Sequence, residues 1–117
     1  MLINMKEMLK VANENNFAVP AFNISSLPML NGVFNKCEEL KSPVIIAIHP
    51  DELSYVEDSF VKTIIDKANK SELPVVLHLD HGCSIKQVIN AIKDGFTSVM
   101  IDASTFKFEE NIEITKK

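Results

Sequence analysis

The chain has 117 residues, of which 46% are hydrophobic and 24% are charged, a composition that is ordinary for a globular protein and does not indicate disorder. Sixteen acidic residues against twelve basic ones give a formal net charge of −4, so no global positive field attracts nucleic acid or anionic lipid. No apolar stretch approaches the length of a bilayer span, and no basic region precedes an apolar run at the N-terminus, so we expect a soluble, cytoplasmic protein without a secretory signal.

The first part of the chain predicts a short leading helix and then a strand, a helix and a second strand. Asn4 followed by Glu7 is typical of a helix start, and the serines before Pro28 can cap the second helix. The strands are expected over Ala18 to Asn23 and over Val44 to Ile48. The apolar faces expected for the two helices are Met5, Met8, Leu9 and Ala12, and then Leu30, Val33, Phe34, Cys37 and Leu40.

The remaining chain repeats this alternation of strand and helix. A Ser-x-x-Gln capping box at Ser84 and a glycine at Gly95 predict the two ends of one helix. Its expected apolar stripe is Ile85, Val88, Ile89 and Ile92. The other elements expected are a polar loop around Pro50-Asp51-Glu52, a helix containing Val61, Ile64, Ile65 and Ala68, a strand from Val75 to Asp80, a strand from Thr97 to Asp102, and a last helix opening at Phe108.

Alternating strands and helices with short connections predict an α/β fold with one parallel sheet, and we expect residues 1–117 to form a single unit. Parallel strands end at the same edge of a sheet, where α/β enzymes place their ligands. Asn23, His49, Asp80, His81 and Asp102 are therefore expected to collect at that edge. A self-contained flavodoxin-like sheet is an alternative, although no phosphate-cradling glycine run follows the first strand.

The run His78-Leu79-Asp80-His81-Gly82 is the most informative part of the chain, because it follows the apolar Pro74–Leu77. Side chains alternate along a strand, so His78 and Asp80 point one way, while His81 lies where the strand gives way to a loop. Imidazole and carboxylate together suit a divalent metal or a proton-transfer step. From these residues alone, a capped strand end with a solvated His81 explains the pattern equally well.

Four further runs accompany this motif in a fixed order. Together the runs are Phe17–Asn23, Lys41–Ile46, Pro74–Gly82, Gly95–Ser104 and Phe108–Ile112. In these runs the chain resembles the class II, zinc-dependent ketose-bisphosphate aldolases of the fructose- and tagatose-bisphosphate type. The resemblance implies a TIM (β/α)₈ barrel, which takes about 250 residues. We therefore expect four parallel strands that form the N-terminal half of such a barrel.

The resemblance also implies roles for single residues. Asp80 falls on the general acid that protonates the aldehyde oxygen, and His81 falls on a ligand of the catalytic zinc. Asp102 matches an aspartate that binds metal at an alternative or second position, although it could instead cap the next segment. Asn23 matches an active-site asparagine, and a loop cap is the alternative for it. His49 stands where the family usually has a serine or threonine that contacts substrate.

The implied function is reversible, zinc-dependent cleavage of a ketose 1,6-bisphosphate to dihydroxyacetone phosphate and glyceraldehyde 3-phosphate. Whether the ketose is fructose or tagatose is left open. Only His81 of the principal zinc ligands falls within the chain, so we expect 117 residues alone to be inactive. The alternative is a non-catalytic half-barrel scaffold that self-associates, since half a barrel leaves unpaired strand edges. A homo-oligomer is expected in either case.

Overall fold

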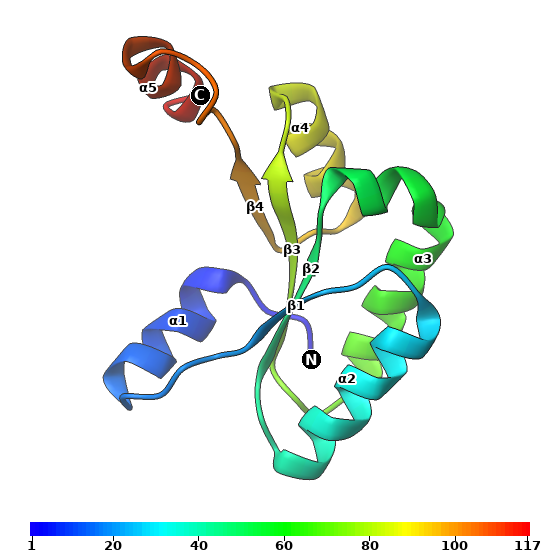
Figure 1. Cartoon of the computed structure of the whole chain (residues 1–117). Helices are drawn as coiled ribbons and strands as arrows, with labels where there is room; N and C mark the ends of the chain where they lie inside the picture. The colour runs from blue at the N-terminus through cyan, green and yellow to red at the C-terminus, as the bar shows by residue number, and fades with distance from the viewer.

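The computed structural model describes residues 1–117, and its centre is one four-stranded sheet (Figure 1). The strands are β1 (Ala21–Asn23), β2 (Val44–Ile48), β3 (Val75–Gly82) and β4 (Ser98–Ile101), all parallel, in the order β1-β2-β3-β4. Strands that are consecutive in the chain are neighbours in the sheet, as in a (β/α)₈ barrel. A flavodoxin-like sheet would place β2 outside β1, so that alternative is excluded.

Five helices surround the sheet: α1 (Met5–Glu14), α2 (Leu27–Leu40), α3 (Pro50–Lys70), α4 (Ile85–Asp94) and α5 (Phe108–Thr115). Figure 1 shows α2, α3 and α4 against one face and α1 on the other side. The fold is that of the N-terminal half of a TIM barrel, with α2 to α4 as part of its outer helical layer. None of the helices combines the length and the apolarity that a bilayer crossing requires.

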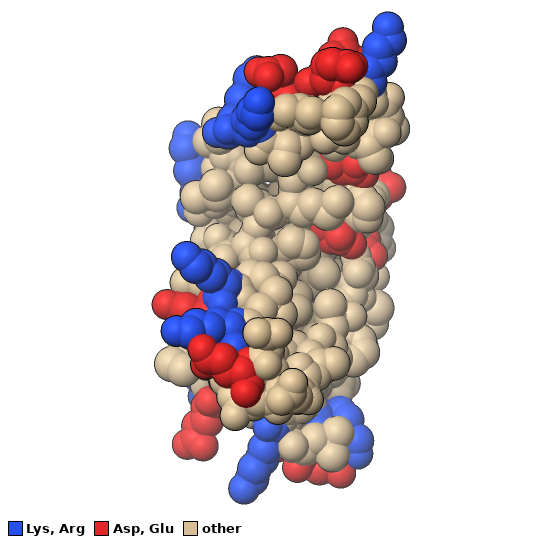
Figure 2. Space-filling view, turned by 90° about the vertical axis from the view of Figure 1, so that its left-hand side faces the viewer, with Lys and Arg blue, Asp and Glu red and all other residues tan.

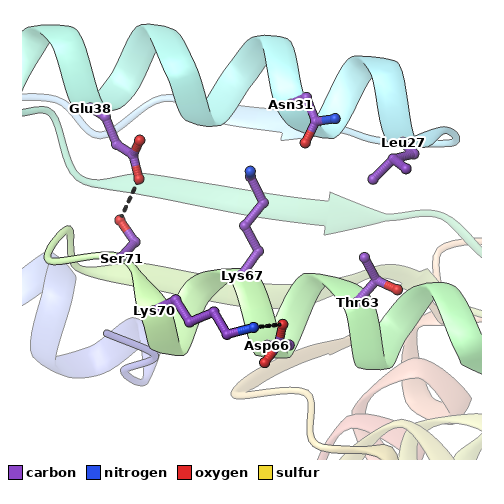
Figure 3. A pocket seen from close by; sticks show the side chains of 8 residues that line it. All are labelled: Leu27, Asn31, Glu38, Thr63, Asp66, Lys67, Lys70 and Ser71. Atoms are coloured by element: carbon purple, nitrogen blue, oxygen red, sulfur yellow. Dashed lines mark hydrogen bonds and ion pairs between the residues drawn. The ribbon is translucent and has the colours of Figure 1, made fainter.

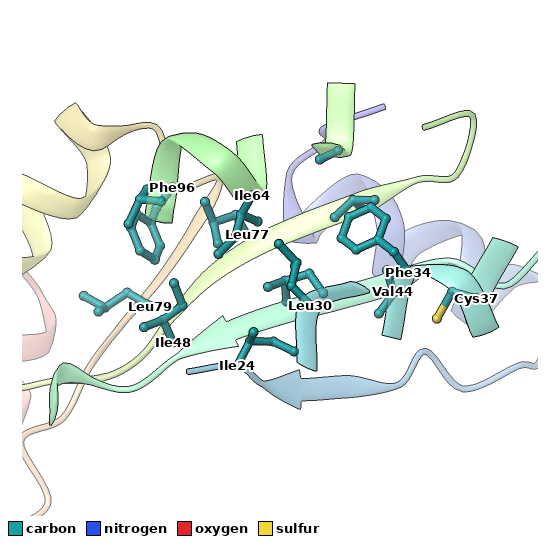
Figure 4. Close-up of a cluster of buried hydrophobic side chains, with 14 of the residues drawn as sticks. Ile24, Leu30, Phe34, Cys37, Val44, Ile48, Ile64, Leu77, Leu79 and Phe96 are labelled. Carbon is teal, nitrogen blue, oxygen red and sulfur yellow. The ribbon is translucent and has the colours of Figure 1, made fainter. Parts of the chain in front are cut away.

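The main core lies between the sheet and helices α2 to α4 (Figure 4). Alternate residues of β3, namely Val75, Leu77 and Leu79, are fully buried there together with Phe34 of α2 and Ile64 of α3. A smaller cluster on the opposite face joins Met8 of α1 to Ile45 and Val76. Both faces of β2 are therefore covered at its start, which explains why its sequence is a continuous apolar run.

The helix ends follow the local signals in the sequence. The side chain of Asn4 accepts a hydrogen bond from the backbone N–H of Glu7 at 2.9 Å, and Ser84 caps α4 by accepting from Gln87 at 3.2 Å. Gly95 ends α4 in the left-handed region, with φ at 99°. A Cβ atom at Gly95 would lie 2.8 Å from Cδ1 of Ile65, so another residue here would adopt a strained backbone and would have to displace the end of the Ile65 side chain. The predicted helix boundaries are confirmed here.

Three of the four strands differ from the sequence prediction at their ends. β4, at Ser98–Ile101, is one residue shorter at each end than the predicted strand from Thr97 to Asp102. The first strand begins at Ala21 and not at Ala18, because Pro20 has no N–H to offer and contributes only its carbonyl oxygen, which accepts from the Ile45 N–H at 2.9 Å. β3 continues beyond Asp80 to Gly82, because the Asp102 N–H donates to the Gly82 carbonyl oxygen at 2.8 Å. The predicted strand end at Asp80 was therefore two residues too early.

The polar segment after β2 is helical, so the predicted loop around Pro50-Asp51-Glu52 is wrong. His49 starts α3 with a capping box: its Nδ1 accepts from the Asp51 N–H at 3.3 Å, and its own N–H donates to Glu52 at 2.9 Å. Proline is favourable in the first turn because its missing N–H would be unpaired there. The helix is interrupted at Glu57, where φ is 60° and ψ is 163°.

Several apolar residues that the helical spacing assigned to the core are exposed. Leu40 is 62% exposed at the end of α2, and Ile92 is 56% exposed on α4. Leu9 and Ile89 are each 46% exposed. Helical spacing shows which face is apolar, but the neighbours available decide how much of it is covered. α4 is packed only on β3, β4 and α3, so part of its apolar stripe has no cover.

Candidate active site

All five candidate residues lie where the parallel strands end. Asn23 is the last residue of β1, His49 follows β2, Asp80 and His81 are near the end of β3, and Asp102 follows β4. Hydrogen bonds, a close charge contact and a ring contact connect them into one group. The prediction that the topology gathers these side chains at one edge is confirmed.

Asn23 and Asp80 are joined across the inner face of the half-barrel. The register pairs Asn23 with Ala47 and Ala47 with His78, and Asp80 follows two residues later on the same face. The Nδ2 amide of Asn23 donates a hydrogen bond to Oδ2 of Asp80 at 3.1 Å. The Asp80 side chain stays 27% exposed, so it is oriented by Asn23 and is still reachable from solvent.

A local irregularity in β3 turns His81 toward the same place as Asp80. Adjacent strand residues normally face opposite sides, but the β3–β4 register shifts between Leu79 and Gly82, and His81 has a φ of 54°. As a result Nε2 of His81 lies 3.8 Å from Oδ1 of Asp80. Gly82 is required beside it, because a Cβ atom there would lie 2.7 Å from the Met100 carbonyl oxygen.

His81 and Asp102 form the shortest polar contact of the site. Nδ1 of His81 lies 2.7 Å from Oδ2 of Asp102, and the other carboxylate oxygen accepts from the Ser104 N–H at 2.9 Å. The hydrogen bond with Asp102, followed by the charge of Asp80, raises the pKa of His81. Hydrogen bonds from His81 and Ser104 hold the pKa of Asp102 well below its usual range. Asp102 is therefore a carboxylate at neutral pH.

His49 is close to His81 and is fixed by its own helix. The two ring centroids are 5.8 Å apart and the ring planes are inclined by 50°. Because Nδ1 of His49 accepts the Asp51 N–H, the neutral ring carries its proton on Nε2. Both imidazoles border a cavity of about 440 Å³. Its lining residues are His49, Pro50, Asp51, His81, Cys83, Asp102, Thr105 and Phe106.

The first histidine of the motif has a different environment. Nδ1 of His78 lies 2.8 Å from Oγ of Ser98 on the neighbouring strand. Burial lowers the pKa of His78, against a smaller opposing effect of the Asp80 charge. His78 is thus a hydrogen-bonded, partly buried histidine inside the half-barrel, and it does not join the His81–Asp102 pair.

A sequence model described as class-II fructose-bisphosphate aldolase matches residues 3–117. The chain belongs to this family. The fructose-bisphosphate aldolase of Thermus caldophilus is 37% identical over 117 residues, covering 100% of the chain and 38% of the relative. That of Geobacillus stearothermophilus is 41% identical over 121 residues, covering 99% and 42%. The chain thus spans about two fifths of these relatives.

Solved structures agree with this assignment. The YdjI aldolase of Escherichia coli K12 superposes with a TM-score of 0.93 and 38% identity, over 99% of this chain and 44% of that one. The fructose-bisphosphate aldolase of Campylobacter jejuni, at 24% identity, shares the fold with a TM-score of 0.84 over 98% of this chain and 42% of its own. The chain therefore has the fold of the first part of a class II aldolase.

The metal associated with class II aldolases can be tested against the donors present. Asp102 occupies Nδ1 of His81 and leaves Nε2 as the nitrogen available to a metal, and a carboxylate that holds the other nitrogen is the usual partner of a metal-binding histidine. No group of three or more His, Cys, Asp or Glu side chains in the chain is placed to hold a metal ion. The donors present therefore fit one ligand of a metal site and do not complete a site by themselves.

Sequence reasoning missed the residues that orient the site. Ser98 positions His78, and the backbone of Ser104 holds Asp102. The second of these had a local signal, because an aspartate commonly accepts from the N–H two residues ahead. The capping role of His49 had none, since histidine is not among the preferred N-cap residues.

Proposed function

We propose that residues 1–117 supply the proton-transfer carboxylate and one metal-binding imidazole of a class II aldolase. The reaction is the reversible cleavage of a ketose 1,6-bisphosphate to dihydroxyacetone phosphate and glyceraldehyde 3-phosphate. The observation that carries the proposal is the connected group Asn23, Asp80, His81 and Asp102 at the carboxyl ends of three strands, in a chain that belongs to this family.

Asp80 is proposed as the group that moves the proton at the aldehyde oxygen. In condensation it donates a proton to that oxygen, and in cleavage it removes the proton from the corresponding hydroxyl. Asn23 donates to Oδ2, which fixes the carboxylate plane and leaves Oδ1 directed toward His81. A proton-transfer group has to be held in place and still reach the substrate, and the partial exposure of Asp80 meets both conditions.

His81 is proposed as a zinc ligand through Nε2. Asp102 keeps the proton of His81 on Nδ1, which selects the tautomer with a free lone pair on Nε2. Zinc, when bound, would polarise the ketone and stabilise the negative charge that develops on carbon–carbon cleavage. Direct binding of a metal by Asp102 stays a prediction. Each oxygen of Asp102 already accepts one hydrogen bond, so a metal would have to bind a remaining lone pair of the carboxylate.

Asn23 and His49 are proposed to contact substrate at the two sides of this group. Nε2–H of His49 is a hydrogen-bond donor of fixed tautomer, which suits a phosphate or hydroxyl oxygen. A serine or threonine hydroxyl can donate and accept, whereas this imidazole in its neutral form only donates at Nε2. The substitution is therefore proposed to favour an acceptor oxygen of the sugar phosphate.

The inner face of the half-barrel is proposed to be covered by further protein. Its edge strands β1 and β4 have unpaired outer edges, and Met100, on the same face of β4 as Ser98, is 39% exposed. Figure 2 shows charged side chains gathered at the ends and margins of the molecule, with a broad uncharged surface between them. A continuing barrel or a second copy of the chain would cover this surface. Size-exclusion chromatography at several concentrations tests the second copy, the proposed homo-oligomer.

The catalytic proposal is tested by completing the barrel. Residues 1–117 are fused to the part of the E. coli YdjI aldolase that they do not cover, guided by the superposition of the two chains. Coupled assays with fructose and tagatose 1,6-bisphosphate are expected to detect cleavage that a chelator abolishes, and no cleavage by residues 1–117 alone. A folded, zinc-loaded fusion that cleaves neither ketose would refute the proposal, as would zinc-dependent cleavage by the isolated chain.

A further inference from the structure

One lysine of this chain is placed unlike all the others. The basic residues are twelve lysines, with no arginine, and eleven of them are exposed. Lys67 of α3 is the exception, because it is partly buried. Its ammonium lies 5.3 Å from the centroid of the Phe34 ring, which belongs to the main core. Lys67 is thus drawn inward, against the tendency of lysine to keep its charge in water.

Lys67 reaches into a cleft of about 340 Å³ between α2 and α3. Figure 3 shows its side chain extending from α3 toward α2, between Asn31 and Glu38. Phe34 contributes a cation–π contact, but no carboxylate lies within ion-pair distance of the Lys67 ammonium. A cation with no counter-ion in its own chain gains from an anion that enters the cleft.

The two acidic residues of the cleft are already engaged. Asp66 pairs with Lys70 at 2.6 Å, and Glu38 accepts a hydrogen bond from Ser71 at 3.0 Å (Figure 3). Neither carboxylate therefore forms a direct ion pair with Lys67. The amide of Asn31 lines the same cleft and makes no hydrogen bond to another residue, so it is a second donor beside the ammonium.

We propose that this cleft is a binding site for a small oxyanion, the phosphate or carboxylate group of a small molecule, with Lys67 as its principal contact. An ammonium–oxyanion hydrogen bond is charge-assisted, and the partly enclosed position of Lys67 strengthens it relative to an exposed lysine. The site is separate from the candidate active site: its residues belong to the outer helices α2 and α3 and to Ser71, which follows α3, and none of them takes part in the hydrogen bonds or the ring contact that connect the candidate active-site residues.

The test is a titration of the ¹⁵N-labelled 117-residue chain with sodium phosphate, sodium acetate and sodium chloride at matched ionic strength, followed by NMR. Phosphate or acetate is expected to cause saturable shifts in α2 and α3 around Asn31 and Lys67, with a dissociation constant in the millimolar range. The anion that saturates identifies a phosphate or a carboxylate site. Equal shifts in chloride, or no saturable shift in this cleft, would overturn the proposal.

Three variants test whether Lys67 is the principal contact of the anion. Lys67→Met keeps the aliphatic contact with Phe34 but removes the charge, and it is expected to weaken binding by about tenfold or more. Glu38→Gln removes a negative charge from the cleft and is expected to tighten binding. Lys62→Met, an exposed lysine of the same helix outside the cleft, is the matched control and should leave binding unchanged. Binding that survives Lys67→Met, or that is weakened equally by Lys62→Met, contradicts the site.

Discussion

The two faces of β3 differ more than any other two regions of the molecule. On the face toward the helices, Val75, Leu77 and Leu79 are fully buried in the main core. On the other face, His78 and Asp80 are partly exposed and make polar contacts with Ser98 and Asn23. Because side chains alternate along a strand, one segment of chain supplies stability on one side and chemistry on the other. Substitutions should therefore separate the two properties.

The largest expected effects are on activity, from the chemical face. In the completed barrel, Asp80→Ala is expected to lower turnover by about 10² to 10⁴ while zinc stays bound, since a positioned proton donor contributes about that much. His81→Ala is expected to lower zinc content and activity together, because it removes a metal ligand. Metal analysis and the coupled assay on both variants decide the roles.

These experiments can refute the role of Asp80 and the role of His81 independently. Equal loss of zinc in the two variants would make Asp80 a metal ligand. Full zinc retention in His81→Ala would remove His81 from the metal site. Asp102→Asn tests whether Asp102 orients His81 or binds the metal directly. If Asp102 only orients His81, the substitution is expected to weaken zinc affinity by about 10- to 100-fold.

Substitutions on the helix-covered face of β3 are expected to lower the free energy of unfolding. Leu77→Ala removes a fully buried side chain from the main core and is expected to lower the free energy of unfolding by about 2–5 kcal/mol. Leu9→Ala is the control, because Leu9 is 46% exposed on α1 and its truncation should cost much less. Urea denaturation followed by circular dichroism measures both. A similar loss for the two variants would mean that the main core is not where the structure places it.

Two glycines, Gly95 at the end of α4 and Gly32 inside α2, are expected to have smaller and opposite effects on stability when they are replaced. Gly95→Ala forces an L-residue into the left-handed region and against Ile65, which is expected to destabilise the chain by about 1–2 kcal/mol. Gly32→Ala lies inside α2 with no atom within 4 Å of the added methyl, so it is expected to stabilise by about 0.5–1 kcal/mol. Thermal unfolding of the two variants should therefore shift in opposite directions, and a shift in the same direction would contradict this.

The smallest expected effect is the pH dependence of the His81–Asp102 pair. The folded chain raises the pKa of His81 above 6.5 and lowers that of Asp102 below 3.8. The contribution of His81 is complete below pH 6.5 and is lost as the pH rises through its folded pKa, whereas the contribution of Asp102 is present above pH 3.8 and is lost as the pH falls. The pair therefore stabilises the fold most between these two values.

The pH dependence of the His81–Asp102 pair can be measured directly. The difference in unfolding free energy between wild type and Asp102→Asn is expected to be larger at about pH 5.5 than at an alkaline pH above the raised pKa of His81, where its imidazole is neutral. Ser98→Ala, which removes the hydroxyl partner of the other histidine, serves as a comparison because burial lowers the pKa of His78 and its contact with Ser98 is not an ion pair. An Asp102→Asn effect that is the same at both pH values would show that no charged pair forms.

Much of the architecture could be predicted because its signals are local. The caps at Asn4, Ser84 and Gly95 are side-chain and backbone preferences that act within one turn of helix. The apolar runs of β2 and β3 indicated buried strands, and the alternation with helices indicated a parallel sheet. Because all four strands are parallel, their carboxyl ends lie at the same edge of the sheet. The candidate residues could be named for this reason before their contacts were known.

The contacts themselves were decided by tertiary structure. Asn23 and Asp80 are 57 residues apart, and His81 meets Asp102 only because a register shift in β3 and a φ of 54° turn its side chain. The position of Lys67 over Phe34 likewise depends on a neighbour distant in sequence. Spacing determines which face a side chain occupies, whereas packing of separate elements determines its partner, its exposure and its charge.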